Sequence, residues 1–216
     1  WMALTIVLAL LWVGSLMIPV LGPLLFNLLS PLLFAGLMIG CRALENGEPL
    51  NVTHLLAGFK QQAAPLVTVG GVYLVGTVIV VGIVMVIAGD SMPHSVLPKP
   101  GTDIETLQAA ARGLALAFAV GAAVYLPLLM LIWFAPLLVV FNGLAPVAAM
   151  KLSFAACVRN MLPFVVYGAA VVLMWLVLSL PAALGAIGGL LVIALLVASI
   201  PVLICSIYTS YKDIFR

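Results

Sequence analysis

Charged residues are nearly absent from this chain. Only 6% of its 216 residues are Asp, Glu, Lys or Arg, and 66% are hydrophobic. Soluble domains are about one quarter charged, so this composition excludes a water-soluble fold and indicates an all-α integral membrane protein, because helices satisfy their own backbone groups inside lipid. The net charge of +2 is too small for a nucleic-acid-binding surface. Nucleic acid is therefore excluded as a partner.

Residues that carry chemistry are equally few. The two histidines and three cysteines show no zinc or haem spacing, so we expect neither a metal site nor a cofactor. Ser153 and Cys157 lie one helical turn apart but have no histidine or acidic neighbour in sequence, which argues against an enzyme. The cysteines are expected at the cytoplasmic side, where thiols stay reduced and no disulfide forms. They are Cys41, Cys157 and Cys205.

Long apolar runs predict six membrane spans within a single transmembrane domain, residues 1–216. A span needs about 20 apolar residues. The spans are expected at about 2–19, 24–41, 65–89, 109–141, 162–180 and 186–208. For 109–141, one tilted helix kinked near Pro127 and Pro136 is favoured over two shorter helices. A turn over 19–23, an outer loop over 90–108 and a polar tail over 209–216 complete the chain.

The basic residues predict the orientation. With both termini in the cytoplasm, six of the eight lie on the cytoplasmic side, and only Lys99 and Arg112 lie outside. The positive-inside rule therefore predicts a multi-pass protein of the bacterial inner membrane with cytoplasmic N- and C-termini.

Two segments between spans are too short and too polar to cross the bilayer. The first begins at Asn51, a suitable helix N-cap, and the second at Pro146. Apolar residues recur in each at steps of three and four, as on one face of a helix. These are Val52, Leu55, Leu56, Phe59 and Ala63, then Val147, Met150, Phe154, Val158 and Met161. We expect two amphipathic helices along the cytoplasmic surface, with their stripes in lipid or against the bundle.

The order of span, surface helix, proline and span occurs twice, over about 24–89 and 109–180, with flanking spans at 2–19 and 186–208. Pro31-Leu-Leu is matched by Pro136-Leu-Leu, and Pro65 by Pro163. Both copies begin on the outer side, so we predict a parallel internal repeat about an axis along the membrane normal. Chance likeness between proline-rich apolar sequences is the alternative.

Candidate binding residues lie on the surface helices. They are Lys60, Lys151, Arg159 and His54. Under the repeat the three basic residues form a shallow platform for lipid headgroups or a partner, and ordinary positive-inside anchoring is the alternative. Candidate helix-packing residues are the glycines of small-residue motifs, which serve packing in the bundle or a contact with another membrane protein or a second copy of the chain. These are Gly36, Gly40, Gly121, Gly185 and Gly189.

Five segments carry a resemblance to a known family. They are SPLLFAGLM (30–38), GEPL (47–50) with HLLAGFK (54–60), WFAP (133–136), KLSFAACVRN (151–160) and YTSYKDIF (208–215). Together they resemble an uncharacterised proteobacterial inner-membrane protein family, and more distantly YciC-like proteins and the membrane region of some glycerophosphodiester phosphodiesterases. The resemblance covers nearly the whole chain, implies residues ahead of Trp1, and carries no catalytic chemistry with it.

Two functional hypotheses follow. The first, ranked higher, is a non-catalytic scaffold or accessory subunit that binds membrane lipids or a protein partner. The second is an uncoupled carrier or channel for a lipid-like or amphipathic small molecule that moves between the repeats. No ionisable residue lies in the middle of a predicted span, which argues against coupled transport. A repeat interface packed without any cavity would remove the basis of the second hypothesis.

Overall fold

The computed structural model describes residues 1–89 and 104–215, and all regular structure in these residues is helical. The elements are α1 (Met2–Leu16), α2 (Leu21–Glu45), the 3₁₀ helix η1 (Val52–Leu56), α3 (Ala57–Gln61), α4 (Ala63–Gly89), α5 (Ile104–Ile132), α6 (Ala135–Asn142), α7 (Pro146–Arg159), α8 (Met161–Ser179), the 3₁₀ helix η2 (Leu180–Leu184) and α9 (Gly185–Phe215). The predicted all-α fold is confirmed.

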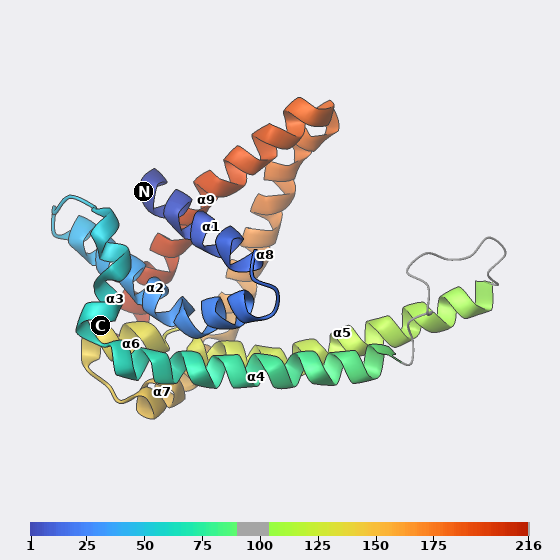
Figure 1. Cartoon of the computed structure of the whole chain (residues 1–216), viewed down its shortest axis with the longest axis horizontal. Coiled ribbons are helices and arrows are strands. Elements are labelled where there is room, and N and C mark those ends of the chain that lie inside the picture. The colour runs from blue at the N-terminus through green and yellow to red at the C-terminus, as the bar shows by residue number, and fades with distance from the viewer. Residues whose placement is uncertain (90–103, 216) are drawn as a thin grey trace.

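Helical hairpins extend from a small core (Figure 1). The α4–α5 hairpin extends to the right and the α8–α9 hairpin to the upper right, while α1 and α2 lie closer to the core. In the core, α2, α6, α7 and the C-terminal part of α9 bury one apolar cluster that includes Leu32, Met38, Phe134 and Leu138. Helix α8, all of which is described, contributes no buried residue. Apolar helices exposed on most sides are typical of surfaces that face lipid.

Four stretches of the described residues are long and apolar enough to cross a membrane. They are Leu21–Glu45, Ala63–Gly89, Leu107–Asn142 and Met161–Phe215, the last being the α8–α9 hairpin. Helix α1 has 15 residues and is about 22 Å long, shorter than the roughly 30 Å of hydrocarbon in a bilayer. Helices that could span a membrane are thus present, and the count of six spans stays a prediction.

Two predicted boundaries were wrong. Helix α5 begins at Ile104, so residues 104–108 are helical instead of belonging to the outer loop, and residues 90–103 of that loop lie outside the described residues. Helix α9 continues to Phe215, so the predicted tail after residue 208 is its last two turns. Its polar side chains have partners on other helices, described below, and these contacts extend the helix beyond its apolar stretch.

The favoured single helix over 109–141 was also wrong, because the helix is interrupted between α5 and α6. The Phe134 N–H and the Met130 carbonyl are the donor and acceptor of one ordinary i→i−4 helix bond. Here the Ser153 hydroxyl of α7 lies between them, accepting from Phe134 N at 3.0 Å and donating to Met130 O at 2.7 Å. Pro136 removes a further N–H at the start of α6. A side chain inserted into the helix ladder and a proline together cause the break.

The first surface segment, η1 with α3, begins as predicted at Asn51. Its Oδ1 accepts from Thr53 N–H at 3.4 Å, and His54 Nδ1 accepts from Asn51 N–H at 3.0 Å, which makes a capping box. The segment packs backbone to backbone on α2. A Cβ on Gly58 would lie 2.3 Å from the Leu32 carbonyl oxygen, a distance that no side chain tolerates.

The second surface segment, α7, packs through its small residues. Its buried side chains are Ala149, Met150, Ser153, Ala156 and Cys157. Most of the predicted apolar stripe, including Val147, Phe154 and Val158, is exposed instead and available to lipid. Ser153, which lies outside the predicted apolar stripe, is fully buried, because its hydroxyl satisfies backbone groups at the break between α5 and α6.

Candidate functional site

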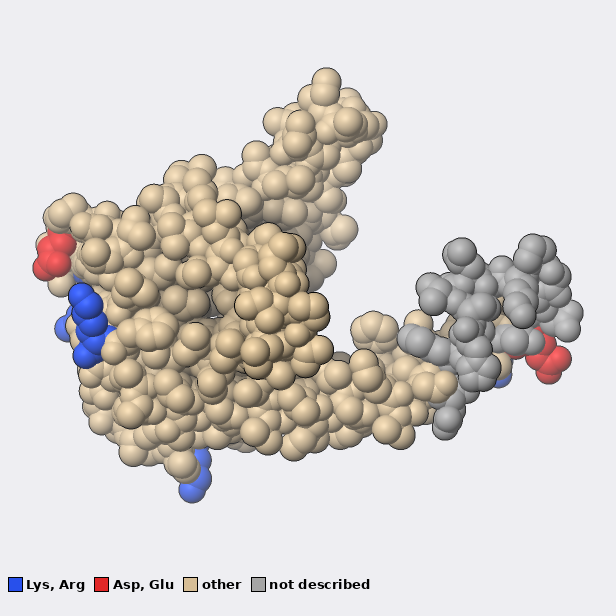
Figure 2. All heavy atoms as spheres, in the orientation of Figure 1, with Lys and Arg blue, Asp and Glu red and all other residues tan. Residues whose placement is uncertain are grey.

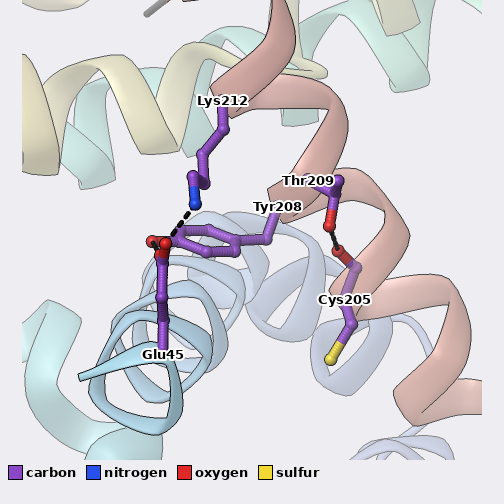
Figure 3. A network of polar contacts seen from close by, with 5 residues as sticks. All are labelled: Glu45, Cys205, Tyr208, Thr209 and Lys212. Carbon is purple, nitrogen blue, oxygen red and sulfur yellow. Dashed lines mark hydrogen bonds and ion pairs between the residues drawn. The ribbon is translucent and has the colours of Figure 1, made fainter.

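A polar cluster joins the last turns of α9 to the ends of α2 and α6. Tyr208 donates to Glu45 Oε2 at 2.7 Å, and Lys212 pairs with the same carboxylate (Figure 3). Tyr211, one turn further along the same helix, donates to Asn142 Oδ1. We name these five residues the C-terminal polar cluster. Glu45 is the last residue of α2 and receives two partners from α9.

The C-terminal polar cluster places the starts of the two surface segments at one end of the molecule. Val52 of η1 and Pro146 of α7 follow Glu45 and Asn142 within a few residues, and both of these residues are bound by the same turns of α9. Figure 2 shows basic and acidic side chains at this end and again near the far end of the α4–α5 hairpin, with an uncharged surface between. This distribution is typical of a protein whose middle lies in lipid.

The aromatic members stabilise this cluster more than the ion pair does. Tyr208 and Tyr211 are 6% and 4% exposed, and both rings pack against Phe141 of α6. The Lys212 and Glu45 side chains remain 30% and 38% exposed, and such a pair contributes at most about 1 kcal/mol. The cluster therefore acts mainly by fixing the end of α9 against α2 and α6.

The predicted binding residues lie on the outside of the surface segments. Lys60 near the end of α3, and Lys151 and Arg159 in α7, are all exposed. Whether they form one platform stays a prediction. His54 is half-buried and its Nδ1 is occupied by the capping box. Among the residues that the structure describes, no three His, Cys, Asp or Glu side chains group so that they could hold a metal.

The predicted packing glycines divide into two groups. Gly36 faces the His54 and Leu55 carbonyls, Gly40 the Leu50 side chain, and Gly121 the Val84 side chain, so these three occupy contacts inside the chain. Gly185 has a positive φ of 72° at the start of α9, and neither it nor Gly189 would bring a Cβ within 4 Å of another described group. These last two leave room for a contact outside the chain.

Three cavities lie in a row between the helices. The α1–α2 cavity, about 280 Å³, is lined by Trp12, Ser15, Leu16, Pro23, Phe26, Asn27, Ser30 and Tyr73. The central cavity, about 210 Å³, is lined by Ser30, Pro31, Phe34, Tyr73, Leu129, Ile132, Trp133, Pro136 and Ile207. The α8–α9 cavity, about 280 Å³, is lined by Trp133, Asn160, Pro163, Phe164, Tyr167, Ile207, Ser210, Asp213 and Ile214.

Neighbouring cavities in this row share walls. Ser30 and Tyr73 belong to the first and second, and Trp133 and Ile207 to the second and third. Pro31 and Pro136, the matched prolines of the predicted repeat, face the central cavity together. Small-molecule sites usually start at about 300 Å³, so one cavity alone fits a headgroup or part of an acyl chain, and a longer molecule needs more than one.

Two cysteines far apart in sequence lie next to each other. The Sγ atoms of Cys41 in α2 and Cys205 in α9 are 3.9 Å apart, and both thiols are free. We expect copper phenanthroline, which removes two electrons and two protons from a thiol pair, to join them slowly at neutral pH and faster as the pH rises, because Cys41 is buried and the thiolate is the reactive form. Mass spectrometry of unreduced peptides should find the Cys41–Cys205 link and none in Cys41→Ser. Full alkylation of both thiols after oxidation would contradict the packing of α2 against α9.

Cys157 is expected to be unreactive at neutral pH. Burial raises the pKa of its thiol to about 11, a rise that a hydrogen bond with Ser153 only partly offsets. At pH 8 only about one such thiol in a thousand is ionised, and the thiolate is the nucleophile. Iodoacetamide should therefore label Cys157 at least about tenfold more slowly in the folded protein than in SDS. The labelling rate should rise as the pH approaches 11; equal rates in both states would contradict its burial.

Sequence reasoning missed the C-terminal polar cluster and the cavities. Tyr208, Tyr211, Lys212 and Phe215 recur at steps of three and four, which marks one face of a helix and was a usable signal. Their partners on α2 and α6 had no signal, because Glu45 and Asn142 look like ordinary turn residues.

The long apolar helices, with charged side chains confined to a few places, define an α-helical integral membrane protein. No family model and no solved structure matches the chain. A probable inner membrane protein of Burkholderia thailandensis is 30% identical to it in an alignment that covers 92% of this chain and 78% of the relative. The chain belongs to the family of that inner-membrane protein. The more distant similarity to YciC-like proteins and glycerophosphodiester phosphodiesterases stays a prediction.

Proposed function

We propose that the protein is a non-catalytic scaffold or accessory subunit of the bacterial inner membrane that binds lipid. The observation that carries this proposal is the α8–α9 cavity, which lies beside the C-terminal polar cluster and joins aromatic walls to a few polar groups. An apolar site with few polar groups suits an amphiphile, whose chain then lies along the apolar hairpins and whose headgroup stays at the polar end.

The proposed orientation follows the charges. We place the C-terminal polar cluster, both surface segments and both termini on the cytoplasmic side, in line with the positive-inside rule. Lys60, Lys151 and Arg159 are then exposed towards the inner leaflet, where each basic residue contributes about 1 kcal/mol of attraction to anionic headgroups. His54 lies on the same segment as Lys60.

Lipid retention tests this proposal. The protein is purified from membranes in a mild detergent and washed with several volumes of detergent buffer to remove loosely bound lipid. It is then examined by native mass spectrometry. We expect phospholipid to remain bound to the folded protein and to leave after unfolding in SDS. A monomer that reproducibly carries neither lipid nor a protein partner would contradict the proposal.

The row of cavities favours a second candidate, an uncoupled carrier of lipid-like molecules. The α1–α2 cavity reaches Pro23 near the start of α2, and the α8–α9 cavity reaches Asp213 near the end of α9. The central cavity shares walls with both. A lipid that passes from one of these cavities to the next would move between the two leaflets.

Transbilayer lipid exchange separates the two candidates. Vesicles with a fluorescent phospholipid in both leaflets lose about half their signal to external dithionite when no exchange occurs. If the protein is a carrier, the signal of protein-containing vesicles falls well below half, and Trp133→Ala, which alters the wall between two cavities, changes the rate. A stable half signal with retained lipid supports the scaffold and contradicts the carrier.

A further inference from the structure

We propose that the α8–α9 cavity binds the ammonium group of an amphiphile's headgroup. The inference rests on the proposed lipid binding and names the headgroup chemistry that this one cavity selects. The membrane source of such a group is a zwitterionic phospholipid with an amine in its headgroup, and the free source is an alkylammonium amphiphile.

The walls of the cavity are aromatic. The Trp133 and Phe164 rings meet edge to face with centroids 5.9 Å apart, and Tyr167 lies one helical turn after Phe164 on α8. All three side chains are half-buried, so their rings line the cavity while a part of each stays accessible. Aromatic faces attract cations through the ring quadrupole, and the attraction grows when the cation is shielded from water.

The polar groups of the cavity offer acceptors. The Asn160 amide nitrogen donates to Ala156 O at 2.9 Å, and the Ser210 hydroxyl donates to Ser206 O at 2.9 Å. The Ser206 hydroxyl donates to Leu203 O, so the 2.7 Å contact between Tyr167 and Ser206 has the tyrosine as donor. Each of these side chains therefore donates one hydrogen bond within the protein and keeps oxygen lone pairs that can accept from the N–H groups of a ligand.

The lining residues of the cavity include one acidic side chain and no basic one. Asp213 is exposed at its edge, and none of the cavity's lining residues, all of them described, is Lys, Arg or His. Lys212, the next residue in sequence, pairs with Glu45 on α2. A carboxylate beside aromatic rings attracts an ammonium group and repels the free phosphate of an acidic lipid.

A basic residue next to the cavity suits the phosphate of a zwitterionic headgroup. Arg159, at the end of α7, directly precedes Asn160 of the cavity and is exposed. In a headgroup that carries both charges, the phosphate is therefore accommodated next to the cavity while the ammonium group enters it.

Competition between lipids tests the inference. The protein in mild detergent is offered equal amounts of phosphatidylethanolamine and phosphatidylglycerol, and retained lipids are counted by native mass spectrometry. We expect a preference of about five- to tenfold for phosphatidylethanolamine, the size of one good cation–π and ion contact. Dodecyltrimethylammonium should displace the bound phosphatidylethanolamine, and dodecyl maltoside at the same concentration should not, which separates ammonium recognition from chain binding.

Asp213→Asn should bring the ratio of bound phosphatidylethanolamine to bound phosphatidylglycerol close to one, and Asp213→Lys should reverse this preference. Both proteins should stay folded because the residue is exposed. Glu48→Gln, which neutralises an exposed carboxylate outside the cavity, is the matched control and should keep the wild-type ratio. Lipid retention without headgroup preference, or a preference unchanged in Asp213→Asn, overturns this inference and leaves the proposed lipid binding intact. Loss of all lipid retention in the wild type overturns both.

Discussion

Replacing Ser153 by alanine should destabilise the protein by about 2–4 kcal/mol, because the change leaves the Phe134 N–H and the Met130 carbonyl without their shared hydroxyl. Pro136 keeps the chain from simply closing into a straight helix. We expect a fall in Tm of about 5–12 °C in detergent, measured by intrinsic fluorescence.

The control for this change is Ser179→Ala. Its hydroxyl also donates to a backbone carbonyl, Leu176 O at 2.7 Å, but the residue is exposed at the end of α8 and bridges no break. It should move the free energy of unfolding by less than about 0.5 kcal/mol. Equal effects of the two substitutions would show that Ser153 does not support the break between α5 and α6.

Two adjacent glycines of α4 should respond differently to substitution by alanine. A Cβ on Gly70 would lie 2.0 Å from the Leu28 carbonyl oxygen of α2. This oxygen belongs to the helix backbone, so the clash is relieved only if the two helices separate. Gly70→Ala should therefore force α4 away from α2 and destabilise the protein by about 3 kcal/mol or more. Unfolding in mixed micelles with increasing SDS measures the loss.

Gly71→Ala is the matched control, because a Cβ there meets no described atom within 4 Å. Alanine has a higher helix propensity than glycine by up to about 1 kcal/mol, so this protein should be equally or slightly more stable. Destabilisation by Gly71→Ala that equals the effect of Gly70→Ala would contradict the close approach of α4 and α2.

Features fixed by neighbouring residues could be predicted from the sequence. Apolar stretches long enough to cross lipid predicted α2, α4 and α8 within a few residues, because length and hydropathy are local properties. Asn51 was predicted as an N-cap for the same reason, since a cap binds an N–H only two residues away.

Features fixed by contacts between distant residues could not be predicted. The break at Phe134 depends on the Ser153 hydroxyl, 19 residues later in the chain, and no local pattern around Phe134 indicates this partner. Glu45 meets Tyr208 and Lys212 across more than 160 residues. The cavities likewise depend on how Pro31 and Pro136 approach each other, which no local pattern records.

The central claim is that both surface segments lie in the cytosolic leaflet, beside the cavity that holds the headgroup. Single cysteines in place of Lys60, Arg159 and Gln108, in a chain whose native cysteines are serine, test it through labelling of spheroplasts with a membrane-impermeant maleimide. Position 108 should be labelled in intact spheroplasts, and positions 60 and 159 only after permeabilisation. Labelling of positions 60 and 159 from opposite sides would contradict the account.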